Sequence, residues 1–70
     1  MPRFCVNTTT DNHGDHEVHD LSASCPKLPL PSHRHDLGVH ADCHSAVRAA
    51  KAIYPTADGC GWCARPCHTS

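Results

Sequence analysis

Six cysteines and eight histidines lie within only 70 residues, a high density of side chains that bind metals or form disulfides. Large apolar side chains number about a dozen, and burying each contributes only ~1.5–3 kcal/mol. The candidates for a core are Phe4, Val6, Val18, Leu21, Leu28, Leu30, Leu37, Val39, Val47, Ile53, Tyr54 and Trp62. Because chains this short commonly add a metal ion or disulfides to their core, the sequence predicts one domain over residues 1–70 that cysteine chemistry helps to stabilise.

The choice between a metal and disulfides depends on the compartment, since disulfides persist in oxidising surroundings. Met1-Pro2-Arg3 leads directly into a strand-like segment, not into the apolar stretch of about 7–15 residues that a secretory signal carries. We therefore expect a cytoplasmic protein. An even cysteine count also fits a secreted, disulfide-stapled miniprotein, which stays as an alternative. No segment approaches the ~18–20 apolar residues of a membrane span, so we expect no membrane association.

The first 20 residues have the pattern of a β-hairpin. Residues 3–8 alternate, with Phe4 and Val6 on one face and Cys5 on the more polar face. Residues 9–14 are rich in turn formers, and residues 15–19 resemble a returning strand in which Val18 shares the apolar face. Cys5 is then expected to be a surface or semi-buried thiol.

The middle of the chain predicts a loop, a brief strand and one helix. Prolines make residues 21–36 unfavourable for regular structure, and residues 37–40 can form a third short strand. Asp42 is a good N-cap for a helix over residues 43–54, ended by Pro55. Its apolar stripe is expected at Val47, Ala50, Ile53 and Tyr54. These elements predict the α+β fold class.

The C-terminal segment carries the clearest chemical motif, Cys60-Gly61-Trp62-Cys63. A C-x2-C turn lets two thiolates converge on one tetrahedral zinc ion, and a structural zinc site needs four protein ligands. His19 and Cys25 are the predicted second pair, because they lie where the hairpin ends. A redox dithiol of the thioredoxin kind is a poor alternative, since 70 residues cannot supply that sheet.

Several other residues compete for these roles. Cys67, His68, Cys43 or His16 can replace one of the four ligands, and the spacing alone does not exclude this. Cys43 at the start of the helix is a reactive thiol, a ligand or a small apolar filler, and Cys43 with Cys67 is a candidate disulfide. The remaining histidines are expected to be exposed and not to be fixed ligands; they are His33, His35, His40 and His44.

Catalytic metal motifs are approached but not matched. The segment His16-Glu17-Val18-His19 has one residue too few for H-E-x-x-H and lies in a strand-like segment instead of a helix. The zinc deaminase pattern also fails, because H-x-E is absent and Pro66 precedes Cys67, not Cys60. We therefore expect no enzymatic activity.

The chain contains three further motifs, GDHEVH, the helix C-x2-AV-x2-A and the C-terminal C-x2-C-x3-CH. Through these motifs it resembles a group of small bacterial zinc-binding proteins over nearly its whole length. More distantly, the order of hairpin, His-x5-Cys, capped helix and C-x2-C is similar to the zinc-binding module of the Ada DNA-repair family, a treble-clef-like fold. That resemblance implies zinc ligation by His19, Cys25, Cys60 and Cys63. In that family a zinc-bound cysteine accepts a methyl group from DNA phosphotriesters.

Charge argues against a nucleic-acid partner. The chain has 6 Lys and Arg, 7 Asp and Glu and a net charge of −1, whereas phosphate binding usually requires clustered basic residues. Here they are scattered at Arg3, Lys27, Arg34, Arg48, Lys51 and Arg65. A thiol that accepts methyl groups from DNA is therefore an alternative and not the main prediction. We expect a structural-zinc module, monomeric, whose macromolecular partner is a protein rather than a nucleic acid.

Overall fold

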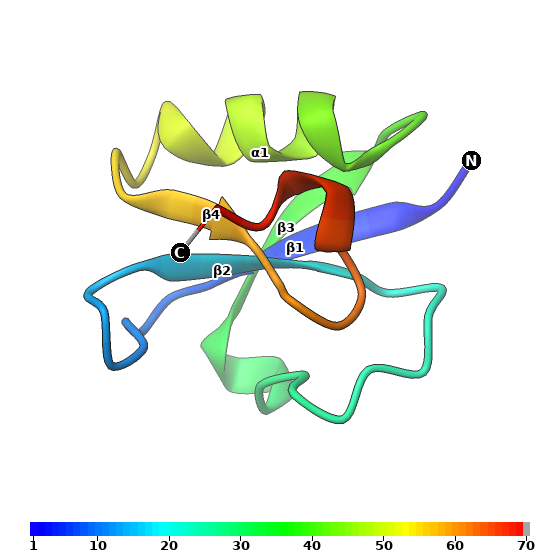
Figure 1. Ribbon diagram of the computed structural model, residues 1–70. Helices are drawn as coiled ribbons and strands as arrows, with labels where there is room; N and C mark the ends of the chain where they lie inside the picture. The colour runs from blue at the N-terminus through cyan, green and yellow to red at the C-terminus, as the bar shows by residue number, and fades with distance from the viewer. Residues whose placement is uncertain (70) are drawn as a thin grey trace.

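Strand β1 (Arg3–Asn7) lies inside a four-stranded sheet of order β3-β1-β2-β4, and this placement organises the molecule. The computed structural model describes residues 1–69. The other strands are β2 (His16–Asp20), β3 (Arg34–Val39) and β4 (Ala57–Gly59), and the helices are α1 (Cys43–Lys51) and the 3₁₀ segments η1 (Pro31–His33) and η2 (Arg65–Cys67). Figure 1 shows α1 across one face of the sheet and the loop after β2 on the other side. The predicted α+β class is confirmed.

The predicted hairpin is present, with bounds that differ by one residue. β1 and β2 pair antiparallel, with Val6 opposite Val18 and Cys5 opposite His19. In the turn, the Asp11 carboxylate accepts hydrogen bonds from the backbone N–H groups of His13 and Asp15, at 2.8 and 3.0 Å. The side chain thus holds the turn that sets the register of the two strands.

Strand β3 begins earlier than the sequence predicted. The proline run ends in η1, and the chain then pairs antiparallel with the free edge of β1 from Arg34 onward. The register shifts between Phe4 and Cys5, which are paired with Gly38 and Asp36 and so leave Leu37 as an extra residue. Gly38 has a φ of +80°, which suits such a bulge. Pairing with β1 thus overrides the loop character predicted for residues 34–36.

Helix α1 is shorter than predicted. Asp42 is the N-cap, as expected, and its side chain accepts from the backbone N–H groups of His44 and Ser45. The helix ends at Lys51, because the chain must turn to bring β4 beside β2. Ile53 is consequently 46% exposed, and its place in the apolar stripe was a wrong prediction. The buried helical positions are Cys43, Ala46 and Ala50.

Strand β4 was missed by the sequence analysis. It has three residues, Ala57–Gly59, and pairs parallel with β2. The pairing continues into the next residue, since the Cys60 N–H donates to the Val18 carbonyl at 2.9 Å. This short strand therefore sets the start of the C-x2-C segment beside the hairpin.

The hydrophobic core lies between α1 and the sheet. Phe4, Val6 and Val18 are buried there, as predicted. Four candidate core residues are instead exposed, namely Leu30, Val39, Ile53 and Trp62. Cys5, expected at or near the surface, is only 1% exposed. The cause is that β1 is an inner strand whose second face is also covered.

No helix in the described part of the chain has the length and apolar character needed to cross a membrane.

The C-terminal segment is fastened to the fold at several points. Cys43 and Cys67 form a disulfide, one of the alternatives that the sequence left open, and it joins the start of α1 to η2. With a sequence separation of 24, such a bond stabilises a fold by roughly 3–4 kcal/mol in the chain-entropy account. His68 Nδ1 donates to the Gly59 carbonyl at 2.9 Å, and the Thr69 hydroxyl donates to the Asp58 carboxylate at 2.8 Å.

Gly59 makes this docking possible, which leads to a testable prediction. A Cβ at this position would lie 2.7 Å from both the Ala64 carbonyl oxygen and Cys67 Cβ. Two backbone contacts are among the short ones, so the neighbours cannot move aside easily. We expect Gly59→Ala to lower the free energy of unfolding of the metal-loaded protein by about 1–3 kcal/mol, measured by urea denaturation. Gly61→Ala is the matched control, since its nearest contact would be an ordinary 3.5 Å; equal stability losses would contradict the prediction.

Candidate metal centre

The four residues predicted as ligands converge on one point of the structure. One donor atom from each of His19, Cys25, Cys60 and Cys63 lies within 4.8 Å of all the others. His19 belongs to β2, Cys25 to the loop after it, and the last two to the segment after β4. The cluster can therefore hold a metal ion and would join three segments that are distant in sequence. That these residues bind a metal remains a prediction.

The separations of the donors fit four-coordinate geometry. Cys25 Sγ lies 3.7 Å from Cys60 Sγ and 3.8 Å from His19 Nδ1, and Cys63 Sγ lies 3.5 Å from the same nitrogen. A tetrahedral ion with metal–sulfur bonds of ~2.3 Å and metal–nitrogen bonds of ~2.0–2.1 Å requires sulfur–sulfur separations of about 3.8 Å and sulfur–nitrogen separations of about 3.6 Å. These three separations therefore match those of a tetrahedral site, and the other donor pairs lie within 4.8 Å.

His19 is placed for this role by its strand. It is fully buried and alternates with Val18, so its ring lies on the sheet face opposite the helix. Nδ1 faces the thiols, whereas Nε2 is buried without a hydrogen-bond partner in the described part of the chain. Burial, with a smaller effect of the Arg34 guanidinium, lowers the pKa of His19 to about 4. The ring is therefore neutral near pH 7, as a metal ligand must be.

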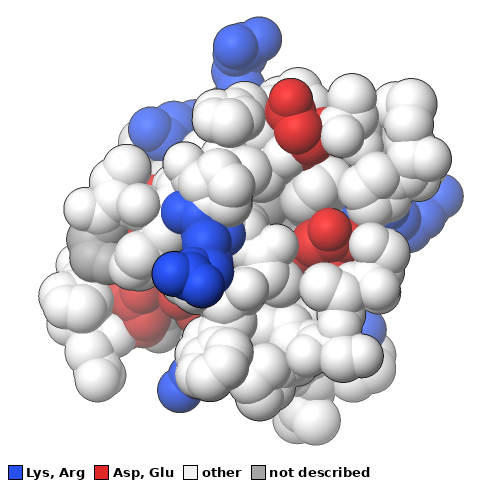
Figure 2. Space-filling model, turned by 45° about the vertical axis from the view of Figure 1, so that its right-hand side comes forward, with Lys and Arg blue, Asp and Glu red and all other residues white. Residues whose placement is uncertain are grey.

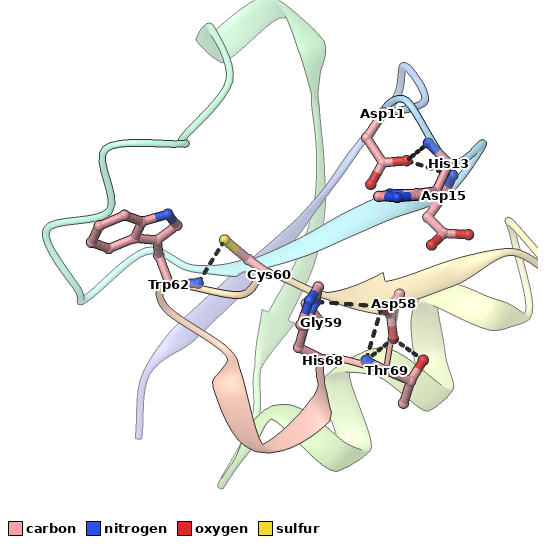
Figure 3. A network of polar contacts seen from close by, with 9 residues as sticks. All are labelled: Asp11, His13, Asp15, Asp58, Gly59, Cys60, Trp62, His68 and Thr69. Carbon is pink, nitrogen blue, oxygen red and sulfur yellow. Dashed lines mark hydrogen bonds and ion pairs between the residues drawn. The ribbon is translucent and has the colours of Figure 1, made fainter.

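Backbone amides donate to both sulfurs of the Cys60–Cys63 turn, one from within the turn and one from β2. The Trp62 N–H donates to Cys60 Sγ at 3.4 Å (Figure 3), and the Asp20 N–H donates to Cys63 Sγ at 3.3 Å. Such bonds favour the thiolate, but burial has the larger effect and raises the pKa of both Cys60 and Cys63. A bound cation would supply the positive charge that is needed to stabilise these two buried thiolates.

The competing ligands lie elsewhere. Cys43 and Cys67 are joined as a disulfide. His68 is hydrogen bonded to Gly59 and lies 3.6 Å from the Asp58 carboxylate (Figure 3). His16 stacks on Tyr54 with 3.9 Å between ring centres, on the apolar side of β2 where its parity with Val18 placed it. None of these donors belongs to the four-residue cluster.

The structure also places two further residues beside candidate ligands, which was not predicted from the sequence. Cys5 pairs directly across from His19 in the sheet, and burial raises its thiol pKa. His44, expected to be an exposed residue without a fixed role, has a ring nitrogen within 4.8 Å of the sulfurs of Cys43 and Cys67. The available signal for this second group was that His44 directly follows a cysteine at a helix start.

The surface beside the turn combines an exposed aromatic ring with mixed charges. Trp62 is 63% exposed, and Figure 3 shows its ring directed away from the sheet. It borders a cavity of about 370 Å³ whose other lining residues include Asp11, Glu17, Lys27 and His68. Burial, and secondarily the Asp11 carboxylate, raises the pKa of Glu17. On the face drawn in Figure 2, acidic and basic residues are likewise interspersed, without a basic stripe.

No known protein family, curated protein or solved structure matches this chain. The structure contradicts a disulfide-stapled miniprotein with every cysteine paired, because Cys5, Cys25, Cys60 and Cys63 are free thiols. Three of these thiols are in the four-residue cluster.

The donor set predicts how many protons a metal ion displaces. The neutral His19 ring releases none, whereas each of the three clustered thiols releases one, so binding of Cd²⁺ should release about three protons near pH 7 and tighten as pH rises. His19→Cys should raise the count to about four. Calorimetry in buffers of different ionisation enthalpy measures this number. A count of one or two in the wild-type protein, or no increase in the variant, would show that the cluster is not the binding site.

Proposed function

We propose that the cluster of His19, Cys25, Cys60 and Cys63 holds a structural Zn²⁺ ion, and that this zinc-stabilised domain acts by contacting another protein. The observation that carries the proposal is the convergence of the four donor atoms within 4.8 Å, with three of their separations at 3.5 to 3.8 Å. Three thiolates and an imidazole in tetrahedral arrangement favour zinc over the oxygen-seeking ions Mg²⁺ and Ca²⁺.

A structural role follows from the composition of the site. Four protein donors fill a tetrahedral shell, whereas a catalytic zinc site keeps one position open for water or substrate. The donors also join β2, the loop after it and the segment after β4. Since structural zinc contributes ~10–16 kcal/mol of apparent binding free energy in small domains, the ion would stabilise the face of the sheet that α1 does not cover.

A protein partner is favoured by the surface around the zinc turn. Trp62 is held by a short turn yet exposed, a combination typical of aromatic anchors at protein interfaces. The mixed charges beside it favour a polar peptide surface over a phosphate backbone. Free thiols in the cluster suit a reducing compartment such as the cytoplasm.

Removal of the ion tests the structural role. We expect native mass spectrometry to find one zinc ion per chain. Complete chelation should unfold the protein, because His19 and the three thiols then lose the ion that joins them. Collapse of amide dispersion in the ¹H–¹⁵N NMR spectrum is the readout, with recovery when zinc is restored. A metal-free chain that keeps its dispersed spectrum would refute a structural ion.

The interface role predicts that Trp62 is dispensable for folding. Because this ring is mostly exposed, Trp62→Ala should retain one zinc and change the free energy of unfolding by no more than about 0.5 kcal/mol. The matched control is Phe4→Ala in the core, where a loss of about 3–5 kcal/mol is expected. Denaturant titration of both zinc-loaded variants makes the comparison. A core-like loss for Trp62→Ala would assign this residue to the fold and remove the argument for an interface.

A further inference from the structure

We propose that Cys43, Cys67 and His44 form a second, redox-gated metal site: closed while the disulfide is intact, and able to bind a second Zn²⁺ ion once the disulfide is reduced. The three donor atoms already lie within 4.8 Å of one another. Two thiolates and one imidazole are a known catalytic-type zinc set that leaves the fourth position to water. This site shares no ligand with the cluster of His19, Cys25, Cys60 and Cys63, so it does not rest on the proposed function.

The two groups of sulfur atoms require different conditions. Cys25 and Cys60 have their sulfurs 3.7 Å apart and remain free thiols, so they are preserved by reducing surroundings or by a bound ion. A permanent disulfide is rare in such surroundings, where disulfides are commonly catalytic or redox-sensing. Within one small chain, the Cys43–Cys67 bond is therefore the group that changes state with redox conditions.

The fold keeps the two sulfurs together when their bond opens. Cys67 is held by its backbone N–H, which donates to the Ala64 carbonyl at 2.9 Å, and by close packing against Gly59. Beyond it, the Thr69 backbone and hydroxyl bind the Asp58 carboxylate. Cys43 is fixed by the capped first turn of α1. The dithiol would therefore remain close to His44 without the covalent bond.

Access to the bond is provided on one side. A cavity of about 280 Å³ is lined by Phe4, Ala41, Asp42, Cys43 and His44, among others. The Asp42 carboxylate lies 3.7 Å from His44 Nδ1, within ion-pair distance but beyond hydrogen-bond distance. Cys43 lines this cavity and Cys67 does not, so we assign the attack of an incoming thiolate to Cys43 Sγ.

The chemical step needs a dithiol reductant. Its thiolate forms a bond to Cys43 Sγ as the Cys43–Cys67 bond breaks, and Cys67 leaves as a thiolate. The second thiol of the reductant then displaces Cys43, so the reductant ends as a disulfide and the protein gains two electrons and two protons. Binding of Zn²⁺ releases the two thiol protons again.

Zinc and thiol counts before and after reduction test the site. The full-length zinc-loaded protein is treated with an immobilised dithiol, equilibrated with free Zn²⁺, desalted and analysed by native mass spectrometry, with thiols titrated after denaturation. We expect the thiol count to rise from four to six, because the disulfide opens, and one zinc ion to be gained. The double variant Cys43→Ser with Cys67→Ser, treated identically, should gain none.

Competition with a zinc indicator separates His44 from the other histidines. His44→Gln should keep the redox change in thiols but weaken the additional zinc by at least about tenfold, the smallest loss usual even for an outer-shell partner. The matched control is His35→Gln, an exposed residue of β3 that belongs to neither cluster, which should leave this affinity unchanged. The same zinc count in both redox states, an unchanged thiol count, or equal effects of the two histidine variants would overturn the proposal.

Discussion

The convergence of one histidine and three cysteines on the sheet face opposite α1 is the constraint on which the rest of the structure depends. Helix α1 covers only one face, where Phe4, Val6 and Val18 are buried against alanines. On the other face, the described part of the chain places no second α-helix, only the proline-rich loop with the single turn of η1 and the segment after β4 (Figure 1). Side chains in these segments are too few to form a second apolar layer. Donors joined through one ion would provide it instead.

The parts of the chain that could be predicted are those set by local sequence signals. The hairpin follows from strict alternation around Phe4 and Val6, and the helix start from the Asp42 cap, because both signals are local. The four candidate ligands were also predictable, since a C-x2-C turn requires a second pair and the hairpin exit offers one. Local chemistry was therefore enough for the centre of the site.

Non-local features were not predictable in the same way. β4 consists of Ala57, Asp58 and Gly59, which favour a turn, and it is a strand only because β2 offers a free edge. Cys5 was placed at the surface because its neighbours on that face are polar, yet it is buried on a strand that lies between β2 and β3. Trp62 was counted with the core, yet it is 63% exposed in the turn between Cys60 and Cys63. For β4 and Cys5 the deciding contacts come from segments that are distant in the sequence, whereas Trp62 is directed outward by its own turn.

The short strand β4 also connects the two sulfur groups mechanically. Cys60 follows it directly and is tied to Val18, while Gly59 packs against Cys67. From Cys63 to Cys67 only three residues intervene, so the two sulfur groups are also neighbours along the chain. If the disulfide were opened, the Cys67 backbone would keep its bond to Ala64, and Thr69 would keep its bonds to Asp58. These bonds would hold the last residues described in place, so one sulfur group could change its redox state without dismantling the other.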